Sequence, residues 1–175
     1  PTRELAIQVS GVCNKLKRAA PVRCVAVYGG ASQEEQQEQL AQPTSLALLV
    51  IGTPGRLLAV LDTTSLGLER ARMLVLDEAD RMLALGFAEQ LETLRGALPA
   101  NERDDIEEGG GGGEGGGGGG GAGGEGMGKR PGRQTLLFSA TFPKTVRLVA
   151  KQWLAPKPAI VKIEAADKSS AAAAA

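Results

Sequence analysis

Four short apolar runs, separated by segments with helical spacing, constrain the fold of this chain more than any other feature. The runs are VRCVAV at 22–27, LALLVI at 46–51, MLVL at 73–76 and TLLF at 135–138. Strands that are apolar along their whole length are typical of a parallel sheet covered by helices on both faces. The alternation of such strands with helices therefore predicts an α/β fold.

Segments with helical character lie around these runs. Helical patterns run through 5–16, 33–42 and 54–61, then from 81 to 87 into an amphipathic helix ending near Leu98, and finally through 143–154. Thr53 and Pro54 are expected as the N-cap and first residue of the third helix, because both residue types favour these positions. Residues 158–163 are expected to be extended.

The segment 109–128 is set apart by composition, since it holds 16 of the 25 glycines. Glycine loses the most entropy on ordering, so we expect a flexible, disordered insertion there and a disordered tail over 164–175. The rest of 1–163 is long enough for a single domain with one sizeable core. A tolerated insertion without a function is preferred over a tether for a partner.

Histidine is absent from the sequence, which excludes every mechanism that needs an imidazole. Cys13 and Cys24 are too few for a four-thiolate zinc site, and they are expected to fill the core in a reducing, intracellular compartment. The nucleus, the nucleolus and the cytoplasm all agree with this expectation, and location in an organelle is left as an alternative. No apolar run approaches the length of a membrane span or follows a basic start, so neither a span nor a signal peptide is expected.

The net charge of zero hides a segregation of charge along the chain. Residues 57–108 carry 12 acidic and 5 basic side chains, whereas residues 129–175 carry 9 basic and 2 acidic ones. Binding of a polyanion depends on a local positive surface and not on the total charge. The neutral total therefore does not exclude a polyanionic partner.

Small or polar residues follow the expected strands directly. They are Gly29-Gly30, Gly52-Thr53, Asp77-Glu78 and Ser139–Thr141. All four should meet at one edge, because ligands in such sheets bind at the carboxyl ends of the strands. Two adjacent carboxylates at the end of a buried strand are costly unless a cation is bound, and Mg²⁺ with a nucleotide satisfies this requirement.

Five short motifs in series resemble one known family. They are Pro1–Ala6 (PTRELA), Gly29-Gly30, Thr53–Arg56 (TPGR), Asp77–Asp80 (DEAD) and Ser139–Thr141 (SAT). Their order and spacing are similar to motifs Ia, GG, Ib, II and III of the first RecA-like domain of DEAD-box RNA helicases, apart from the glycine insertion. The resemblance covers roughly 1–163. It implies a RecA-like parallel sheet flanked by helices, a three-layer sandwich of the P-loop NTPase type that is incomplete at its N-terminus.

The resemblance implies an ATP-dependent RNA helicase that uses ATP and Mg²⁺. Asp77 would hold Mg²⁺ through water, and Glu78 would polarise the water that attacks the γ-phosphate. Asp80, Ser139 and Thr141 would couple the nucleotide state to duplex unwinding through hydrogen bonds between two loops. Without the other motifs, Ser139 and Thr141 would be interpreted as strand-end caps.

The resemblance also implies contacts with the RNA sugar-phosphate backbone. The matching positions are Thr2, Arg3, Gly29, Gly30, Thr53, Gly55 and Arg56. A helix N-terminus with an adjacent guanidinium attracts phosphate, and such contacts read little base sequence. Gly29 and Gly30 have a plain turn as their alternative explanation. The five aromatic residues are expected to serve in packing and not in base stacking.

Several family features have no match in this chain. No segment of this sequence matches the Gly-Lys-Thr phosphate loop, the adenine-reading motif or the second RecA-like domain, which is an expected partner. The segment Gly123–Lys129 fits the phosphate-loop pattern, and we interpret this match as a coincidence of low complexity. We expect the 175-residue chain alone to have no measurable ATPase activity and to be prone to aggregation. A non-catalytic RNA-binding or scaffold protein is the alternative, and a flavodoxin-like domain would not explain the motifs.

Overall fold

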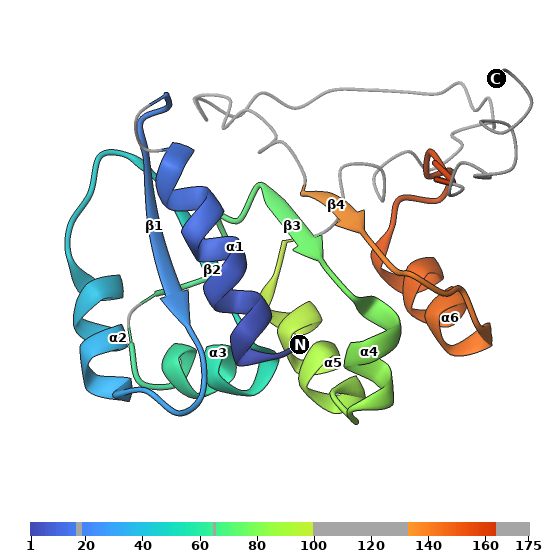
Figure 1. Ribbon diagram of the computed structural model, residues 1–175, viewed down its shortest axis with the longest axis horizontal. Coiled ribbons are helices and arrows are strands. Elements are labelled where there is room, and N and C mark those ends of the chain that lie inside the picture. Colours follow the sequence, from blue (N-terminus) through green and yellow to red (C-terminus); the bar gives the residue numbers. More distant parts are fainter. Residues whose placement is uncertain (17–18, 65, 100–132, 164–175) are drawn as a thin grey trace, which may run out of the picture.

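The computed structural model describes residues 1–16, 19–64, 66–99 and 133–163 (Figure 1). The expectations for the glycine-rich segment 109–128 and for the tail 164–175 fall outside these residues. The elements in the described ranges are α1 (Arg3–Leu16), β1 (Val22–Val27), α2 (Gln33–Ala41), β2 (Ala47–Gly52), α3 (Pro54–Leu61), β3 (Met73–Leu76), α4 (Ala79–Ala84), α5 (Ala88–Ala97), β4 (Gln134–Leu137) and α6 (Lys144–Trp153).

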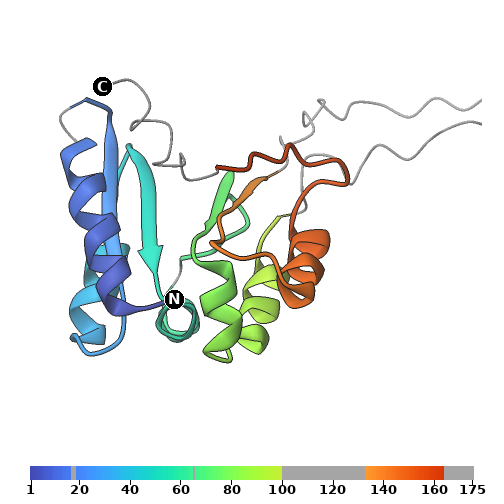
Figure 2. The same ribbon diagram turned by 45° about the vertical axis from the view of Figure 1, so that its right-hand side comes forward.

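The strands form two parallel pairs, β1 with β2 and β3 with β4. All four expected strands are confirmed, with β1 and β3 at the expected bounds and β2 and β4 displaced by one residue. The described residues place them in two separate two-stranded sheets, whereas the sequence suggested one sheet. Figures 1 and 2 together show the strands directed toward the same side of the molecule. The strand ends therefore share one edge, as expected.

The two pairs differ in how their faces are covered. Val25 and Val27 of β1 are buried against α2 and α3, and α1 packs on the opposite face of the β1–β2 pair (Figure 2). On β3, Leu76 is buried, but Met73 and Val75 are 59% and 50% exposed. Alternate strand residues point to opposite faces, so one face of β3 stays open to solvent within the described part of the chain.

Two hydrophobic clusters stabilise the molecule. The smaller one gathers Val25, Val27, Leu40 and Val60, and the larger one surrounds Trp153, which is 1% exposed. Leu57 of α3 packs against both clusters. Helix α3 therefore joins the part of the molecule around β1–β2 to the part around β3–β4.

The helices follow the sequence expectations with one interruption. Thr53 is the N-cap of α3 and Pro54 its first residue, as predicted. The helical pattern over 81–98 forms two helices, because Gly86 adopts a φ of +84° between α4 and α5. Glycine tolerates this left-handed conformation, and a regular helix cannot continue through it.

Other expectations about packing were wrong. Phe138 and Phe142 are 54% and 49% exposed, so they do not serve as core residues. Cys13 and Cys24 are free and half-buried, outside the two cores. Residues 158–163 form neither a helix nor a ladder with another strand, which agrees with the expected extended segment, and the side chains of Ile160, Val161 and Ile163 are exposed.

No helix in the described ranges has both the length and the apolar character needed to cross a bilayer.

Candidate functional site

The turns that follow β3 and β4 are joined by a network of hydrogen bonds around Asp80. The Asp80 carboxylate accepts hydrogen bonds from the Thr141 backbone N–H at 3.0 Å and from the Thr141 hydroxyl at 2.6 Å. The Asp80 backbone N–H donates to the Ser139 hydroxyl at 3.2 Å, and that hydroxyl donates to the Thr141 carbonyl at 2.7 Å. The hydrogen bonds expected between the two loops are therefore present.

These hydrogen bonds also change the acidity of Asp80. The Thr141 hydroxyl is the main cause that holds the pKa of this carboxyl below its ordinary value, with further contributions from Ser139 and backbone groups. Donors that bind the carboxylate favour its charged form. The junction between the two turns is thus built around an ionised Asp80.

The backbone at Glu78 is held in an unusual conformation. Glu78 has φ 51° and ψ 51°, and it is the one residue other than glycine with a positive φ among those the structure describes. A non-glycine residue in the left-handed region costs on the order of 1 kcal/mol or more, and such strain clusters at functional sites. The Asp77 side chain accepts a hydrogen bond from the Glu78 N–H at 2.9 Å, which supports the turn.

Arg3 contacts the backbone of the loop after β1, at the same edge of the molecule as the turns after β3 and β4. Its guanidinium donates to the Gly30 carbonyl at 3.0 Å and lies 5.6 Å from the centre of the Tyr28 ring. Gly30 has a φ of +79°, and a Cβ added there would lie 2.6 Å from the Arg3 Nη1 atom. The positive φ fits the turn explanation for Gly30, and the role of this glycine in RNA contact stays a prediction.

A second arginine reaches the same loop from α3. Arg56 donates to the Ala31 carbonyl at 2.9 Å, and its Nη1 lies 3.5 Å from the Gln36 side-chain oxygen. Gln36 is 5% exposed and exchanges two hydrogen bonds with the backbone of Tyr28, each of 3.1 Å. Gln36 thus contacts Arg56 directly and is linked to Arg3 through Tyr28, whose ring lies beside the Arg3 guanidinium.

Sequence reasoning missed Gln36. It lies in the run QEEQQEQ, in which all seven glutamine and glutamate side chains look alike as solvent-facing helix formers. A weak signal exists, since Gln36 and the buried Leu40 are four residues apart and share one face of α2. That spacing could have identified the inward-facing side chain.

The other expected RNA-contacting residues have separate local roles. The Thr2 hydroxyl accepts a hydrogen bond from the Leu5 N–H at 3.3 Å, so it caps α1. The Thr53 side chain makes no capping bond to α3, although the residue is its N-cap. A Cβ at Gly29 or at Gly55 would meet no atom within 4 Å, so the described chain itself does not require glycine at either position.

The two groups of loops lie on one side of the molecule. The ammonium group of Pro1 is close enough to Glu78 and Asp77 for their charges to raise its pKa, although burial, the larger effect, lowers it overall. The start of α1 therefore lies beside the turn after β3 (Figure 1). A pocket of about 660 Å³ adjoins this turn and is lined by Glu78, Asp80 and Thr141.

No group of three or more metal-ligating side chains occurs within the described ranges. Asp77 is exposed, and one of its oxygens accepts the Glu78 N–H. Mg²⁺ is commonly held by one or two carboxylates together with water and substrate phosphates. A single exposed carboxylate at the strand end therefore fits this type of metal binding.

Comparison with known proteins places the chain in a family. A family model described as DEAD/DEAH box helicase matches residues 1–149. The chain belongs to this family. It is similar to the ATP-dependent RNA helicase DBP3 of Lodderomyces elongisporus, with 35% identity over 98% of this chain and 26% of that protein. It is also similar to the probable ATP-dependent RNA helicase DDX23 of Homo sapiens, with 37% identity over 96% of this chain and 19% of that protein.

A solved structure confirms the expected fold of this DEAD/DEAH box helicase domain. The crystal structure of a DEAD box protein from the hyperthermophile Methanococcus jannaschii matches with a TM-score of 0.62 and 31% sequence identity. The match covers 88% of this chain and 33% of that one. The RecA-like α/β fold is therefore shown. The chain spans about a quarter or less of the length of the two RNA helicases named above.

Proposed function

We propose that this chain forms the part of an ATP-dependent RNA helicase in which the nucleotide and RNA contacts meet. The observation that carries this proposal is the hydrogen-bonded junction of Asp80 with Ser139 and Thr141. The junction joins the acidic turn after β3 to the turn after β4. Two arginines, Arg3 and Arg56, lie on the same edge at the ends of β1 and β2. The names of the similar proteins support the same activity.

On the nucleotide side, Asp77 would hold Mg²⁺ with ATP, and Glu78 would act on the attacking water. Bound Mg²⁺ neutralises charge on the phosphates during phosphoryl transfer. The left-handed backbone of Glu78 turns the chain sharply at the end of β3 and keeps both carboxylates at the strand ends. A strained residue in this place supports a catalytic role, because the strain has no evident benefit for folding.

On the RNA side, Arg3 and Arg56 would bind phosphates along the loop at Gly29 and Gly30. Each guanidinium has five N–H donors, and the described contacts occupy only some of them. The N-terminus of α3 at Thr53 and Gly55 adds backbone donors and a favourable dipole. Such contacts follow the sugar-phosphate chain and would bind RNA with little dependence on its sequence.

Binding of single-stranded RNA tests the RNA side. In fluorescence anisotropy with a labelled RNA, Arg56→Ala should weaken binding several-fold and lower the slope of log K against log salt by about 0.7, the value for one phosphate contact. Arg70→Ala is the matched control, because Arg70 is exposed and precedes β3, away from the carboxyl ends of the strands. Equal losses in both variants would contradict a site at Arg56.

The proposed roles of Asp77 and Glu78 are tested by measuring RNA-stimulated ATP hydrolysis. The assay uses the longest protein product that contains this chain. Glu78→Gln should lower turnover by about a hundredfold or more, as for loss of a general base, while RNA affinity stays unchanged. Glu89→Gln on the exposed face of α5 is the control. A product that binds RNA normally but shows no turnover before mutation would instead favour a non-catalytic RNA-binding protein.

A further inference from the structure

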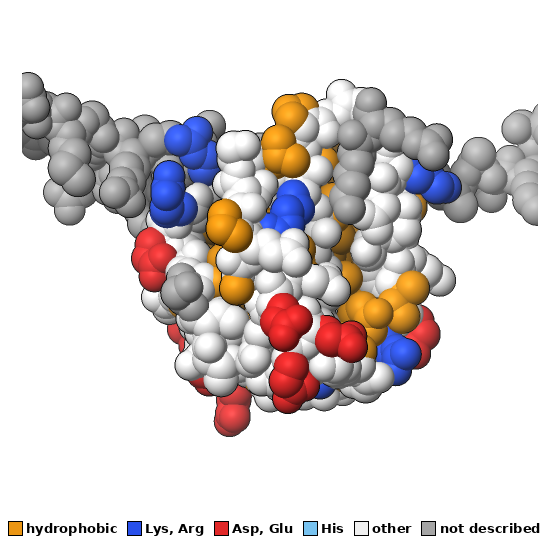
Figure 3. Space-filling view, turned by 90° about the vertical axis from the view of Figure 1, so that its left-hand side faces the viewer, with side chains coloured by type: hydrophobic (Ala, Val, Ile, Leu, Met, Phe, Trp, Pro, Cys, Tyr) orange, Lys and Arg blue, Asp and Glu red, His pale blue; other side chains and the backbone are white. Residues whose placement is uncertain are grey.

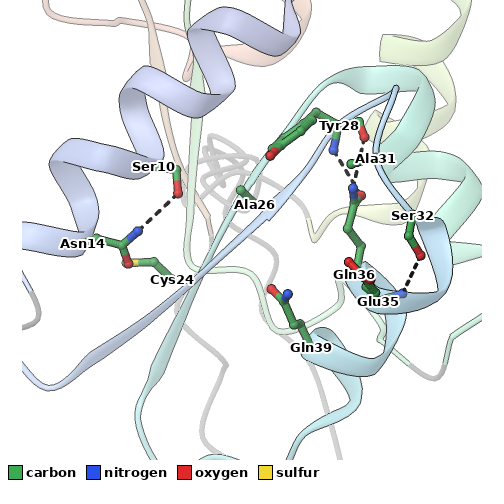
Figure 4. Close-up of a pocket in the computed structure, with 10 residues that line it drawn as sticks. All are labelled: Ser10, Asn14, Cys24, Ala26, Tyr28, Ala31, Ser32, Glu35, Gln36 and Gln39. Atoms are coloured by element: carbon green, nitrogen blue, oxygen red, sulfur yellow. Dashed lines mark hydrogen bonds between the residues drawn. The ribbon is translucent and has the colours of Figure 1, made fainter.

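Gln36 is a buried polar side chain whose role the proposed RNA contacts do not explain (Figure 4). It is 5% exposed, although the other glutamines and glutamates of α2 are half-buried or exposed. Burial of an amide is unfavourable unless its donor and acceptor atoms are hydrogen-bonded. The hydrogen bonds of Gln36 therefore indicate what its burial achieves.

The backbone of Tyr28 fixes the orientation of the Gln36 amide. The amide Nε2 donates to the Tyr28 carbonyl, and the amide Oε1 accepts from the Tyr28 N–H, each at 3.1 Å. The reverse orientation would place one donor against another at the Tyr28 N–H. The Oε1 atom is therefore held in one place, directly before the loop at Gly29 and Gly30.

The same oxygen atom also contacts Arg56. The Nη1 atom of Arg56 donates to the Ala31 carbonyl at 2.9 Å and makes a long hydrogen bond of 3.5 Å to Gln36 Oε1. Because Nη1 carries two N–H donors, these two acceptors use both of them. The Nε and Nη2 donors bond to no other group in the part of the chain that the structure describes. They form a planar edge that can bind a phosphate with two parallel hydrogen bonds.

A glutamine at position 36 leaves the charge of Arg56 intact. The exposed surface of α2 already carries Glu34, Glu35 and Glu38. Figure 3 faces the side of the molecule where α2 lies and shows acidic side chains gathered in its lower part. A further carboxylate in contact with Arg56 would form an ion pair and weaken the attraction of the guanidinium for phosphate. A neutral amide oxygen directs the guanidinium without this loss.

Two neighbouring glutamines of α2 contact α3 at other places. The Gln33 side chain donates to the Ala59 carbonyl at 3.4 Å, and the Gln37 side chain donates to the Thr63 hydroxyl. These hydrogen bonds hold α2 against α3, but they involve neither Arg56 nor Tyr28. Gln37 therefore offers a matched control for a substitution at Gln36.

We propose that Gln36 is a positioning residue that turns the Nε–Nη2 edge of Arg56 toward an RNA phosphate at the loop of Gly29 and Gly30. Gln36 itself does not touch the RNA. It holds the guanidinium in one arrangement relative to the loop before RNA binds, which lowers the entropy cost of binding. This inference rests on the proposed RNA binding by Arg56. It agrees with contacts that do not depend on base sequence, because only a phosphate is bound.

Fluorescence anisotropy with a labelled single-stranded RNA tests this role on the 175-residue chain. Gln36→Leu should weaken binding by about three- to tenfold, as for one lost hydrogen bond, and lower the slope of log K against log salt by about 0.7. Gln37→Leu, which also removes a glutamine contact with α3, should change neither quantity. Unchanged affinity in Gln36→Leu, or an equal loss in Gln37→Leu, would overturn the proposal.

A double-mutant cycle separates positioning from a general loss of structure. If Gln36 acts through Arg56, the double variant of Gln36→Leu with Arg56→Ala should bind RNA as Arg56→Ala alone does. Losses that multiply would mean that the two side chains act independently, which would overturn the proposal. A loss in Arg56→Ala without any loss in Gln36→Leu would overturn this inference and leave the proposed function standing. Normal RNA binding by Arg56→Ala would overturn both.

Arg56→Lys tests the guanidinium edge and leaves the buried amide unchanged, so it applies even where Gln36→Leu does not fold. Lysine keeps the charge but has no planar edge, and it should therefore lose most of the affinity that Arg56→Ala loses. Retained affinity in Arg56→Lys would overturn the proposal.

RNA-stimulated ATP hydrolysis gives a further readout on the longest protein product that contains this chain. Gln36→Leu should raise the RNA concentration for half-maximal turnover by the same factor as the loss of affinity, and leave the maximal turnover unchanged. A lower maximum at an unchanged RNA concentration would indicate loss of folded protein and would contradict a positioning role.

Discussion

The two strand pairs end in loops of opposite charge, although they occupy equivalent places in the fold. At β1–β2, guanidinium groups bind backbone carbonyls, with Arg3 on Gly30 and Arg56 on Ala31. At β3–β4, the carboxylate of Asp80 binds the hydroxyl and amide of Thr141. The same edge therefore offers cations at one end and anions at the other. Two chemically different ligands can bind side by side on one such edge.

The two pairs also differ in burial. Helices pack on both faces of β1, and Leu49 of β2 is 37% exposed, whereas one face of β3 exposes both Met73 and Val75 to a larger extent in the described structure. The larger hydrophobic cluster nevertheless lies with β3 and β4, around Trp153. The stability of that half therefore comes from its helices more than from its sheet, and α3 connects it to the other half through Leu57.

The largest effect is expected from removing core side chains in each half. Leu91→Ala, in the larger cluster, should lower the free energy of unfolding by about 2–5 kcal/mol, and Val27→Ala by about 2 kcal/mol. Urea unfolding can be followed by the fluorescence of the one tryptophan, which reports on the larger cluster, and by far-UV circular dichroism. Both probes should give the same midpoint in each variant, because α3 joins the clusters.

Leu57→Ala sharpens this prediction, since it removes the side chain that both clusters share. The two probes should then separate or the unfolding transition should broaden. Separate midpoints in the unmutated chain would instead mean that the halves unfold independently.

A smaller effect is expected from the paired glycines of the first loop. Gly30→Ala should cost about 1–2 kcal/mol of stability, because alanine disfavours the left-handed φ and its Cβ would displace Arg3. Gly29→Ala should change stability by less than about 0.5 kcal/mol, since a Cβ meets nothing there. Thermal unfolding measures both, and RNA affinity shows whether Gly29 is needed for the ligand instead. A large stability loss at Gly29 would contradict this assignment.

The smallest effect is expected in the pH dependence of the second loop. The pKa of Asp80 is lowered in the folded chain, so its stabilising contribution is complete above the ordinary carboxyl pKa, near 4. It should be lost as the pH falls below that value and passes through the lowered pKa. Melting temperatures of Asp80→Asn and of the unmutated chain should therefore converge toward acid pH. A constant difference between pH 7 and acid pH would contradict the role of the carboxylate charge.

Much of the fold could be predicted because apolar strand-length runs leave few alternatives. The four runs became the four strands, and the polar residues that follow them met at one edge. The bonds of Asp80 to Ser139 and Thr141 followed from the motif resemblance, because neighbouring parallel strands bring their ends together. The roles assigned to individual site residues stay predictions.

The features that could not be predicted depend on tertiary geometry. The spacing from Leu40 indicates that Gln36 faces inward, but its hydrogen-bond partner, the backbone of Tyr28 eight residues away, has no signal in the sequence. Apolar character alone placed Phe138 in the core, but strand alternation directs it to the open face. The conformation of Glu78 has no local signal at all, since glutamate does not favour a positive φ.

The backbone at Glu78 has an evolutionary consequence. Glycine or asparagine would adopt this backbone conformation at a lower energetic cost. Selection for stability alone should therefore replace the glutamate over time. Persistence of an acidic residue there across diverging lineages would accordingly record selection that acts against the easier folding choice, and its loss would mark lineages in which that demand has lapsed.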